Sequence, residues 1–170
     1  MKQRFTQGEG LPRRIGVISD THGLLRPQAV DALRGVEHII HAGDICGVEI
    51  LEQLRKLAPV TAVRGNNDRG PWAQNIPERV KLELGGVRIY VLHDLKELDV
   101  EPADFQVVIA GHSHQPRVEM RDGVLFLNPD SAGPRRFTLP VSVGFLEITA
   151  GAVSASIQEL HISAAVTRGD

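Results

Sequence analysis

Five short apolar runs, each followed within a few residues by polar side chains, limit the fold of this chain more than any other feature. Short buried strands of an open α/β sheet end at a common edge, and ligands bind in the crevice beyond their carboxyl ends. The polar residues that follow the runs are Asp20 and His22 after 15–18, Asp44 after 38–41, Asn66 and Asp68 after 59–63, His93 after 87–92, and His112 and His114 after 107–110. We therefore expect these side chains to meet in one crevice, where the neighbouring glycines 43, 65 and 111 allow the backbone to turn sharply.

The order of the expected elements changes halfway along the chain. In the first half, strands at 15–18, 38–41 and 59–63 alternate with helices at 27–33 and 48–57, whose apolar residues recur at helical spacing. In the second half we expect a strand at 107–110 and three hairpins, with strands at 80–84 and 87–92, 118–121 and 124–127, and 141–148 and 153–160. Parallel β-α-β units followed by antiparallel hairpins predict a mixed α/β domain of two packed sheets with helices outside.

Composition excludes several classes of protein. The 170 residues carry a formal net charge of -2 and no run of Lys or Arg, so no nucleic-acid surface is evident. The single cysteine, Cys46, cannot form an internal disulfide, and no apolar stretch is long enough to cross a bilayer. We expect one domain over 13–162 between loose tails at 1–12 and 163–170, and a cytoplasmic location, with assembly into a homo-oligomer left open.

The donor groups of the expected crevice favour metal binding. Carboxylate, imidazole and amide groups suit Mn, Fe, Zn and similar divalent ions, and the number of Asp and His residues exceeds the needs of one tetrahedral zinc. A single Asp after a strand is more often a turn or cap residue, but the same placement repeated at successive strand ends favours a shared site for two ions. The sequence has no Cys-x-x-Cys, no G-x-S-x-G and no Walker-type loop, which argues against a zinc finger, a serine hydrolase and a P-loop enzyme.

Several polar residues beside these positions allow two interpretations. Arg26 and Arg69 are candidate phosphate contacts through their guanidinium groups, or else solvated loop arginines. Asp68 is expected to orient the neighbouring ligand asparagine or a ligand histidine. Asp94 either accepts a hydrogen bond from a ligand histidine or caps the next turn, and we favour the cap. His41 either supports the site or is an ordinary strand histidine.

Taken in order along the chain, these residues resemble the motifs of the calcineurin-like metallophosphoesterases. The matching motifs are Asp20-x-His22, Gly43–Asp44, Gly65–Asn66-x-Asp68, His93 and Gly111–His112-x-His114. The resemblance covers residues 15–160, and the opening Ser-Asp-Thr-His-Gly at 19–23 is most similar to the small bacterial and archaeal phosphodiesterases. It implies a four-layer αββα sandwich of two mixed β-sheets flanked by helices, with a dinuclear metal centre between the sheets.

The resemblance also implies a role for each matching residue. Asp20, His22 and His114 would hold one ion, Asn66, His93 and His112 would hold the other, and Asp44 would bridge the two. Manganese is the expected ion, with Fe, Zn, Ni or Mg as alternatives. A hydroxide shared by the ions would attack a small phosphodiester. The candidate catalytic residues are Asn66, Asn67, Asp68 and His93.

Two positions depart from the motifs of the family. Asn67 stands where the protein-phosphatase members have a His thought to protonate the leaving oxygen, and an amide cannot deliver that proton near neutral pH. We therefore expect aryl phosphodiesters to be better substrates than alkyl phosphomonoesters. Asp130 stands where the phosphodiesterase branch usually has Gly, in a turn that Asp tolerates better than most residues.

An alternative function comes from a different class of protein. A scaffold subunit of the eukaryotic retromer coat resembles the same fold, works as a protein-binding platform and lacks a complete metal set. Here all seven implied ligand positions carry a residue able to bind metal, which favours the enzyme.

Overall fold

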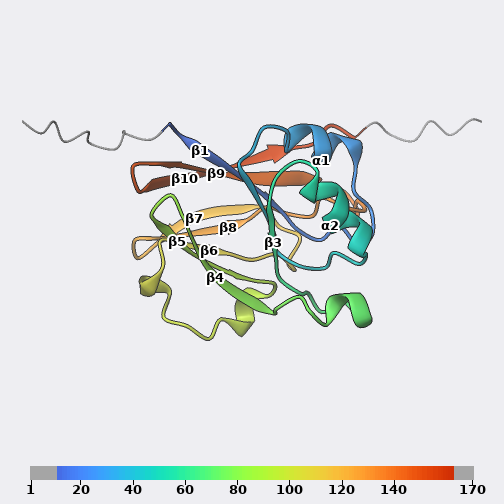
Figure 1. Ribbon diagram of the computed structural model, residues 1–170, viewed down its shortest axis with the longest axis horizontal. Helices are drawn as coiled ribbons and strands as arrows, with labels where there is room; N and C mark the ends of the chain where they lie inside the picture. Colours follow the sequence, from blue (N-terminus) through green and yellow to red (C-terminus); the bar gives the residue numbers. More distant parts are fainter. Residues whose placement is uncertain (1–10, 163–170) are drawn as a thin grey trace, which may run out of the picture.

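Two five-stranded sheets pack face to face in the computed structural model, which describes residues 11–162 (Figure 1). The strands are β1 Arg13–Ile18, β2 His38–His41, β3 Val60–Ala62, β4 Arg79–Leu84, β5 Val87–Leu92, β6 Val107–Ile109, β7 Arg117–Arg121, β8 Val124–Asn128, β9 Ser142–Thr149 and β10 Ala152–Glu159. Each lies within two residues of a strand expected from the sequence. The expected tail at 163–170 and most of the one at 1–12 lie outside the described residues.

Both sheets are mixed, as the sequence predicts. The first has the order β10-β9-β1-β2-β3 and the second the order β4-β5-β6-β8-β7. The three strands β1, β2 and β3 run parallel, and so do β5, β6 and β8. Because parallel strands place their carboxyl ends at the same edge, each sheet gathers three strand ends at one edge.

One of the apolar cores lies between the sheets. Val17 and Ile40 of the first sheet face Ile89, Ile109 and Leu127 of the second, and all of these side chains are buried. Full burial of one such side chain contributes about 1.5–3 kcal/mol. The apolar contact between the sheets therefore fixes the position of one set of strand ends relative to the other.

Helices α1 (Pro27–Ala32) and α2 (Val48–Arg55) cover the outer face of the first sheet (Figure 1). Helix α2 buries Ile50, Leu51 and Leu54 against that sheet, as its apolar spacing predicts. Both helices end earlier than expected, α1 at Ala32 and α2 at Arg55. Over residues 11–162, no helix combines the length and the apolar character needed to cross a membrane.

The outer face of the second sheet is covered by the segment 94–106. This segment holds two 3₁₀ helices, Leu95–Glu97 and Pro102–Asp104, where the four-layer sandwich implied α-helices. Its apolar side chains, such as Leu98 and Phe105, pack on the sheet. The sandwich is confirmed. Its fourth layer is thin because it is built by helices of only three residues, which are too short to show a helical periodicity in the sequence.

Candidate metal centre

The loops that follow β1, β2, β3, β5 and β6 meet at one end of the sandwich. The backbone N–H groups of Asp20 and His22 donate to the carbonyls of Gly43 and Asp44, at 3.0 Å in each case. In the second sheet, the N–H of Gly111 donates to the carbonyl of His93 at 2.9 Å. These bonds join the loop after β1 to the loop after β2, and the loop after β5 to the loop after β6.

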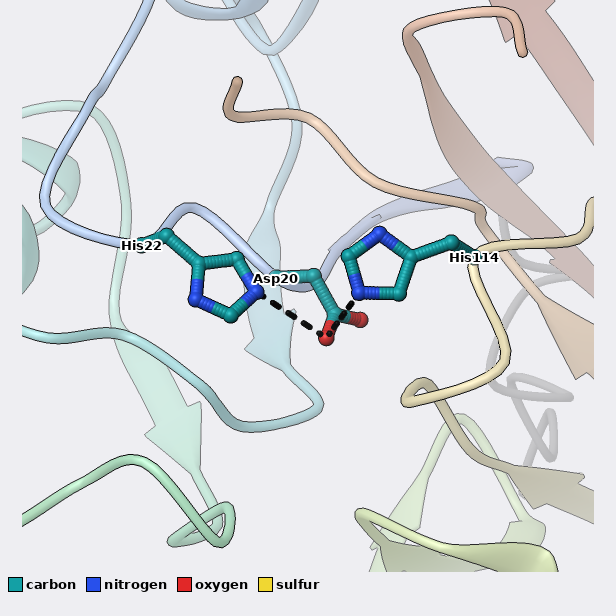
Figure 2. Close-up of side chains that lie close together, drawn as sticks. All are labelled: Asp20, His22 and His114. Atoms are coloured by element: carbon teal, nitrogen blue, oxygen red, sulfur yellow. Dashed lines mark ion pairs between the residues drawn. The ribbon is translucent and has the colours of Figure 1, made fainter. Parts of the chain in front are cut away.

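Asp20, His22 and His114 form the first group of donors (Figure 2). Oδ1 of Asp20 lies 3.7 Å from Nε2 of His22 and 3.3 Å from Nε2 of His114. Among the described residues this buried oxygen has no hydrogen-bond partner, whereas Oδ2 accepts bonds from the hydroxyl of Ser19 (2.6 Å) and the N–H of His112 (3.1 Å). A buried carboxylate oxygen without a proton donor is the arrangement that a cation stabilises.

Asp44 and His93 extend this group toward the second sheet. Oδ2 of Asp44 lies 3.7 Å from Nε2 of His22 and 3.4 Å from Nε2 of His93. Nδ1 of His93 lies 2.7 Å from the carbonyl oxygen of Ala42, so Nδ1 is the donor in this bond and Nε2 is directed to the site. Asp20, Asp44 and His93 are also close enough together to hold one ion. Each of the two carboxylates therefore lies near a histidine of the first sheet and a histidine of the second.

His112 and Asn66 complete the cluster. Nδ1 of His112 lies 3.3 Å from Nε2 of His93 and 3.2 Å from Oδ1 of Asn66. The structure therefore gathers all seven implied ligands, with neighbours 3.2–4.0 Å apart. Imidazole nitrogens and carboxylate and amide oxygens that face each other in this way fit divalent transition ions.

The buried charges of the cluster influence one another strongly. Burial raises the pKa of Asp20, but the nearby imidazoles of His114 and His22 and the hydrogen bond from Ser19 outweigh this and hold it well below its usual range. Burial also raises the pKa of Asp44, while bonds with His93 and Asn67 lower it to about 2. For His93, burial lowers the pKa, but Asp44 and Asp20 raise it to about 8. Both carboxylates are thus ionised at neutral pH, and His93 holds a proton that a metal ion must displace.

Five of the seven implied ligands have left-handed backbone conformations. The φ angles are 53° for Asp20, 45° for His22, 53° for Asp44, 66° for His112 and 53° for His114. Side-chain-bearing residues rarely adopt this region, and such residues cluster at functional sites where surrounding bonds hold them. The hydrogen bonds between the loops supply that restraint here.

The glycines of the motifs allow sharp turns and close contacts between loops. Gly43 has a positive φ of 98°, in agreement with a sharp turn, but Gly65 and Gly111 do not have positive φ. A Cβ at Gly65 would collide with Asp44, and a Cβ at Gly111 would collide with Ser19 and Asp20. Both glycines nevertheless begin a tight turn, since the carbonyl of Gly65 accepts the N–H of Asp68 at 3.2 Å and the carbonyl of Gly111 accepts the N–H of Ser113 at 2.7 Å. Their lack of a side chain also lets two loops approach closely.

Asp68 and Asn67 join the loop after β3 to the loop after β2. The carboxylate of Asp68 accepts bonds from the N–H groups of Gly65 and Cys46, both at 2.8 Å, in place of the expected bond with a ligand side chain. The N–H and the side-chain Nδ2 of Asn67 donate to Oδ1 and Oδ2 of Asp44, at 2.9 and 2.8 Å. Asn67 thus holds both oxygens of a proposed ligand.

His41 is neutral and contacts residues next to the proposed ligands. Its Nδ1 accepts the N–H of Gly43 at 3.2 Å, so Nε2 carries the proton and faces the hydroxyl of Thr21 at 3.0 Å. Complete burial lowers the pKa of His41 to about 3. Thr21 in turn donates to the carbonyl of Ile45 at 3.0 Å. Sequence reasoning overlooked Thr21, although its place between two ligands was a signal.

The remaining candidates have simpler surroundings. Nε of Arg26 donates to the carbonyl of Gly133 at 2.9 Å, and Arg69 is exposed in the loop after β3. Asp94 caps the 3₁₀ helix that follows it by accepting the N–H of Lys96 at 3.0 Å, as favoured. Its Oδ2 also lies 3.7 Å from Nε2 of His112. Asp94 therefore has one contact that fits the cap and one that fits a partner of a ligand histidine.

Asn128, the last residue of β8, also supports the site, and Asp130 lies two residues beyond it. Asn128, which sequence reasoning left without a role, donates through Nδ2 to the carbonyl of Gly111 and to the hydroxyl of Ser113, both at 3.0 Å. Asp130 is fully buried with a φ of 70°, and accepts a bond from the hydroxyl of Ser142 at 3.1 Å. Burial raises the pKa of Asp130 to about 6.

Comparison with known proteins agrees with this geometry. The family model of the calcineurin-like phosphoesterase superfamily domain matches residues 14–151. A probable metallophosphoesterase of Methanothermobacter thermautotrophicus is 39% identical over 158 residues, which cover 84% of this chain and 90% of that protein.

Solved structures share the fold over most of the chain. A novel archaeal phosphodiesterase has a TM-score of 0.70 and 25% identity, and the match covers 85% of this chain and 99% of that one. Vps29 of Cryptosporidium parvum has a TM-score of 0.71 and 20% identity, with coverage of 89% and 99%. This chain is a metal-dependent phosphoesterase and belongs to the calcineurin-like phosphoesterase superfamily.

Proposed function

We propose that this phosphoesterase hydrolyses phosphodiesters at a dinuclear metal centre between the two sheets. The observation that carries the proposal is the buried Oδ1 of Asp20, which faces Nε2 of His22 and of His114 at 3.7 and 3.3 Å. Leaving such an oxygen without a partner costs free energy unless a cation binds there. The similarity to an archaeal phosphodiesterase supports diesters as the substrate class.

The seven ligands divide between two ions in this proposal. Asp20, His22 and His114 hold one, Asn66, His93 and His112 hold the other, and Asp44 is shared. The sharing of Asp44 is supported by the position of its Oδ2, 3.7 Å from Nε2 of His22 and 3.4 Å from Nε2 of His93. Manganese or a similar ion suits this imidazole-rich set better than magnesium. Such ions, when bound, activate water as a nucleophile and neutralise charge on phosphate oxygens.

The residues of the chain itself fix the ligands before substrate arrives. Ser19 and the N–H of His112 hold Oδ2 of Asp20, so Oδ1 is left free for metal. Asn67 fixes the carboxylate of Asp44, and the carbonyl of Ala42 orients the ring of His93. Ligands positioned in this way need little rearrangement on binding.

Asn67 also restricts which esters react well. An amide donates hydrogen bonds but cannot protonate a leaving oxygen, and a general acid typically contributes ~10²–10⁴-fold. Esters whose leaving group is stable as an anion lose least from its absence. Aryl diesters are therefore the favoured substrates, ahead of alkyl monoesters.

The experiment is a matrix of metals and substrates on metal-stripped, reconstituted protein. Mn, Fe, Zn, Ni and Mg are each tested with bis(p-nitrophenyl) phosphate, p-nitrophenyl phosphate and an alkyl monoester. We expect the highest activity with Mn²⁺ or a similar transition ion and with the diester. Asp20→Asn should lose metal and activity, whereas Asp31→Asn, an exposed carboxylate on α1, should keep both.

Full activity after exhaustive chelation, with no metal detected by elemental analysis, would contradict the proposal. Protein that binds no divalent ion and hydrolyses no aryl diester would instead favour the scaffold function. The cytoplasmic location and assembly into a homo-oligomer stay predictions from the sequence.

A further inference from the structure

A cavity of about 480 Å³ lies beside the metal centre, on the outer face of the second sheet. Its floor is formed by the apolar side chains of Val108, Ala110 and Phe126, from β6, the residue after β6, and β8. The 3₁₀ helix Leu95–Glu97 lines one side. The volume lies within the ~300–1,000 Å³ typical of pockets for small organic ligands.

The cavity adjoins the metal centre at His112, which lines both. Nδ1 of His112 is directed to the cluster, 3.3 Å from Nε2 of His93. Its Nε2 lies on the opposite side of the ring, 3.7 Å from Oδ2 of Asp94, which also lines the cavity. A phosphodiester has two ester arms, and only one leaves as the alcohol. With the phosphorus at the metal centre, the retained arm is within reach of this cavity.

The lining combines an apolar floor with two cations. A planar ring in the cavity would cover the apolar surface that its lining leaves exposed, and each Å² removed from water is worth about 25 cal/mol. Lys96 and Arg117 also line the cavity, and both are exposed, so their charged ends are available to a ligand that enters from solvent. Within the part of the chain that the structure describes, the ion pair of Arg117 is a loose one with Glu119, at 3.7 Å.

We infer that this cavity binds the retained arm of the diester, and that this arm is a nucleotide. Its base lies on the apolar floor and its second phosphate faces Lys96 and Arg117. The inference rests on the proposed phosphodiesterase function and extends it to a substrate class. It also assigns a role to the fourth layer, since Leu95 and Lys96 come from the segment that covers the second sheet.

Three substrates that release the same leaving group separate the effect of the retained arm from the effect of the chemical step. They are the p-nitrophenyl phosphodiesters of methanol, of thymidine through its 5′ oxygen, and of thymidine 3′-phosphate through its 5′ oxygen. Each releases p-nitrophenolate, so differences in kcat/KM come from the retained arm. We expect kcat/KM to rise at least tenfold from the methyl to the thymidine ester, and again with the 3′-phosphate.

Two variants locate the effect in the cavity. Ala110→Leu fills the floor and should remove most of the preference for the thymidine ester over the methyl ester. Lys96→Glu, at an exposed position that tolerates charge, should lower kcat/KM at least threefold for the 3′-phosphate ester only. Lys56→Glu, the same charge change at the end of α2, is the matched control and should change none of the ratios.

Binding of thymidine 3′,5′-bisphosphate, measured by calorimetry on the metal-loaded protein, gives a readout that needs no turnover. We expect Ala110→Leu and Lys96→Glu each to weaken this binding at least threefold. Unchanged binding and unchanged substrate ratios in both variants would overturn the nucleotide pocket. Binding that depends on these residues in a protein that hydrolyses none of the esters would support the pocket and contradict the proposed function instead.

Discussion

The imidazole of His93 is buried where the two sheets meet and is held in one orientation. Its Nδ1 bonds to the carbonyl oxygen of Ala42, so the proton that responds to pH is the one on Nε2, which faces Asp44. Both nearby carboxylates stabilise the charged ring and raise the pKa of His93 to about 8, against the burial that lowers it. That same nitrogen is a proposed metal ligand, so proton and metal compete for it.

This competition predicts a pH dependence of metal affinity. The apparent affinity for Mn²⁺ should rise about tenfold from pH 7 to pH 9, because the His93 pKa of about 8 means that the proton is lost over this interval. Competition with a fluorescent chelator measures it. His38→Gln, a control at a histidine outside the cluster, should show the same rise. An affinity that is constant from pH 7 to pH 9 would contradict the argument.

Asp44 is the residue whose loss should affect both ions. Asp44→Asn removes a negative charge that faces His22 and His93, so we expect kcat to fall more than tenfold, about 1.4 kcal/mol in the barrier. Arg69→Ala should cost much less and act mainly on KM. Steady-state kinetics with elemental analysis of each variant tests this. If Asp44→Asn kept more than a tenth of the turnover, its bridging role would be wrong.

Asn67 should determine the balance between two types of ester. Asn67→His supplies a proton donor at the position after the ligand asparagine, so monoesterase activity should rise relative to diesterase activity. Because Asn67 also holds Asp44, metal content must be measured in the same samples. Asn75→His adds an exposed histidine elsewhere and serves as the control. An unchanged ratio with intact metal content would remove Asn67 from the mechanism.

At the scale of elements, the loops of the site hold one another in place. The loop after β1 lies against the loop after β2 through backbone bonds, and against the loop after β6 through the close contact of Gly111 with Ser19 and Asp20. The ligands adopt strained left-handed conformations within these loops. The site therefore depends on how closely the loops approach, as well as on the ligand residues themselves.

Gly111→Ala tests this dependence. The added Cβ meets Ser19 and Asp20, so we expect a loss of about 1–3 kcal/mol in unfolding free energy and at least tenfold weaker Mn²⁺ binding. Gly86→Ala is the control, since its Cβ has open space but its φ of 80° disfavours a side chain. It should lose stability and keep its metal affinity. Equal metal affinity in both variants would refute the argument.

The sequence predicted the strands, and the polar side chains that gather beyond their ends, because both depend on local signals. Apolar runs of three to eight residues marked the strands, and Asp20, Asp44 and His93 followed three of them. The supporting contacts were hidden because they join distant parts of the chain. Asn128 acts on Gly111, 17 positions away, and His41 acts on Thr21, 20 positions away. No spacing rule connects such pairs.

At the scale of the whole molecule, the proposed metal centre draws its ligands from both sheets. Asp20 and Asp44 follow strands of the first sheet, and His93, His112 and His114 follow strands of the second. An ion bound by both sets links the layers at one end of the sandwich. Because the site requires the folded arrangement, ligand binding adds directly to stability.

Divalent metal should therefore raise the melting temperature. At a free Mn²⁺ concentration 100 times its Kd, the folded state gains about 2.7 kcal/mol, which corresponds to about 5–10 °C for a chain of this size. Scanning calorimetry of chelated and reloaded protein measures the shift. Asp20→Asn should abolish the shift, and Asp31→Asn should retain it. A melting temperature unaffected by Mn²⁺ would show that the ion does not bind the folded state preferentially.

The thin fourth layer has a consequence for the way such enzymes diverge. Segment 94–106 lies outside the second sheet, packs on it through side chains such as Leu98 and Phe105, and forms one wall of the cavity beside His112. Most of the proposed ligands lie on other loops. Insertions, deletions or exchange of this segment would reshape the cavity while the ligands stay in place. Substrate preference can thus evolve through one surface segment, and the hydrolytic chemistry is inherited unchanged.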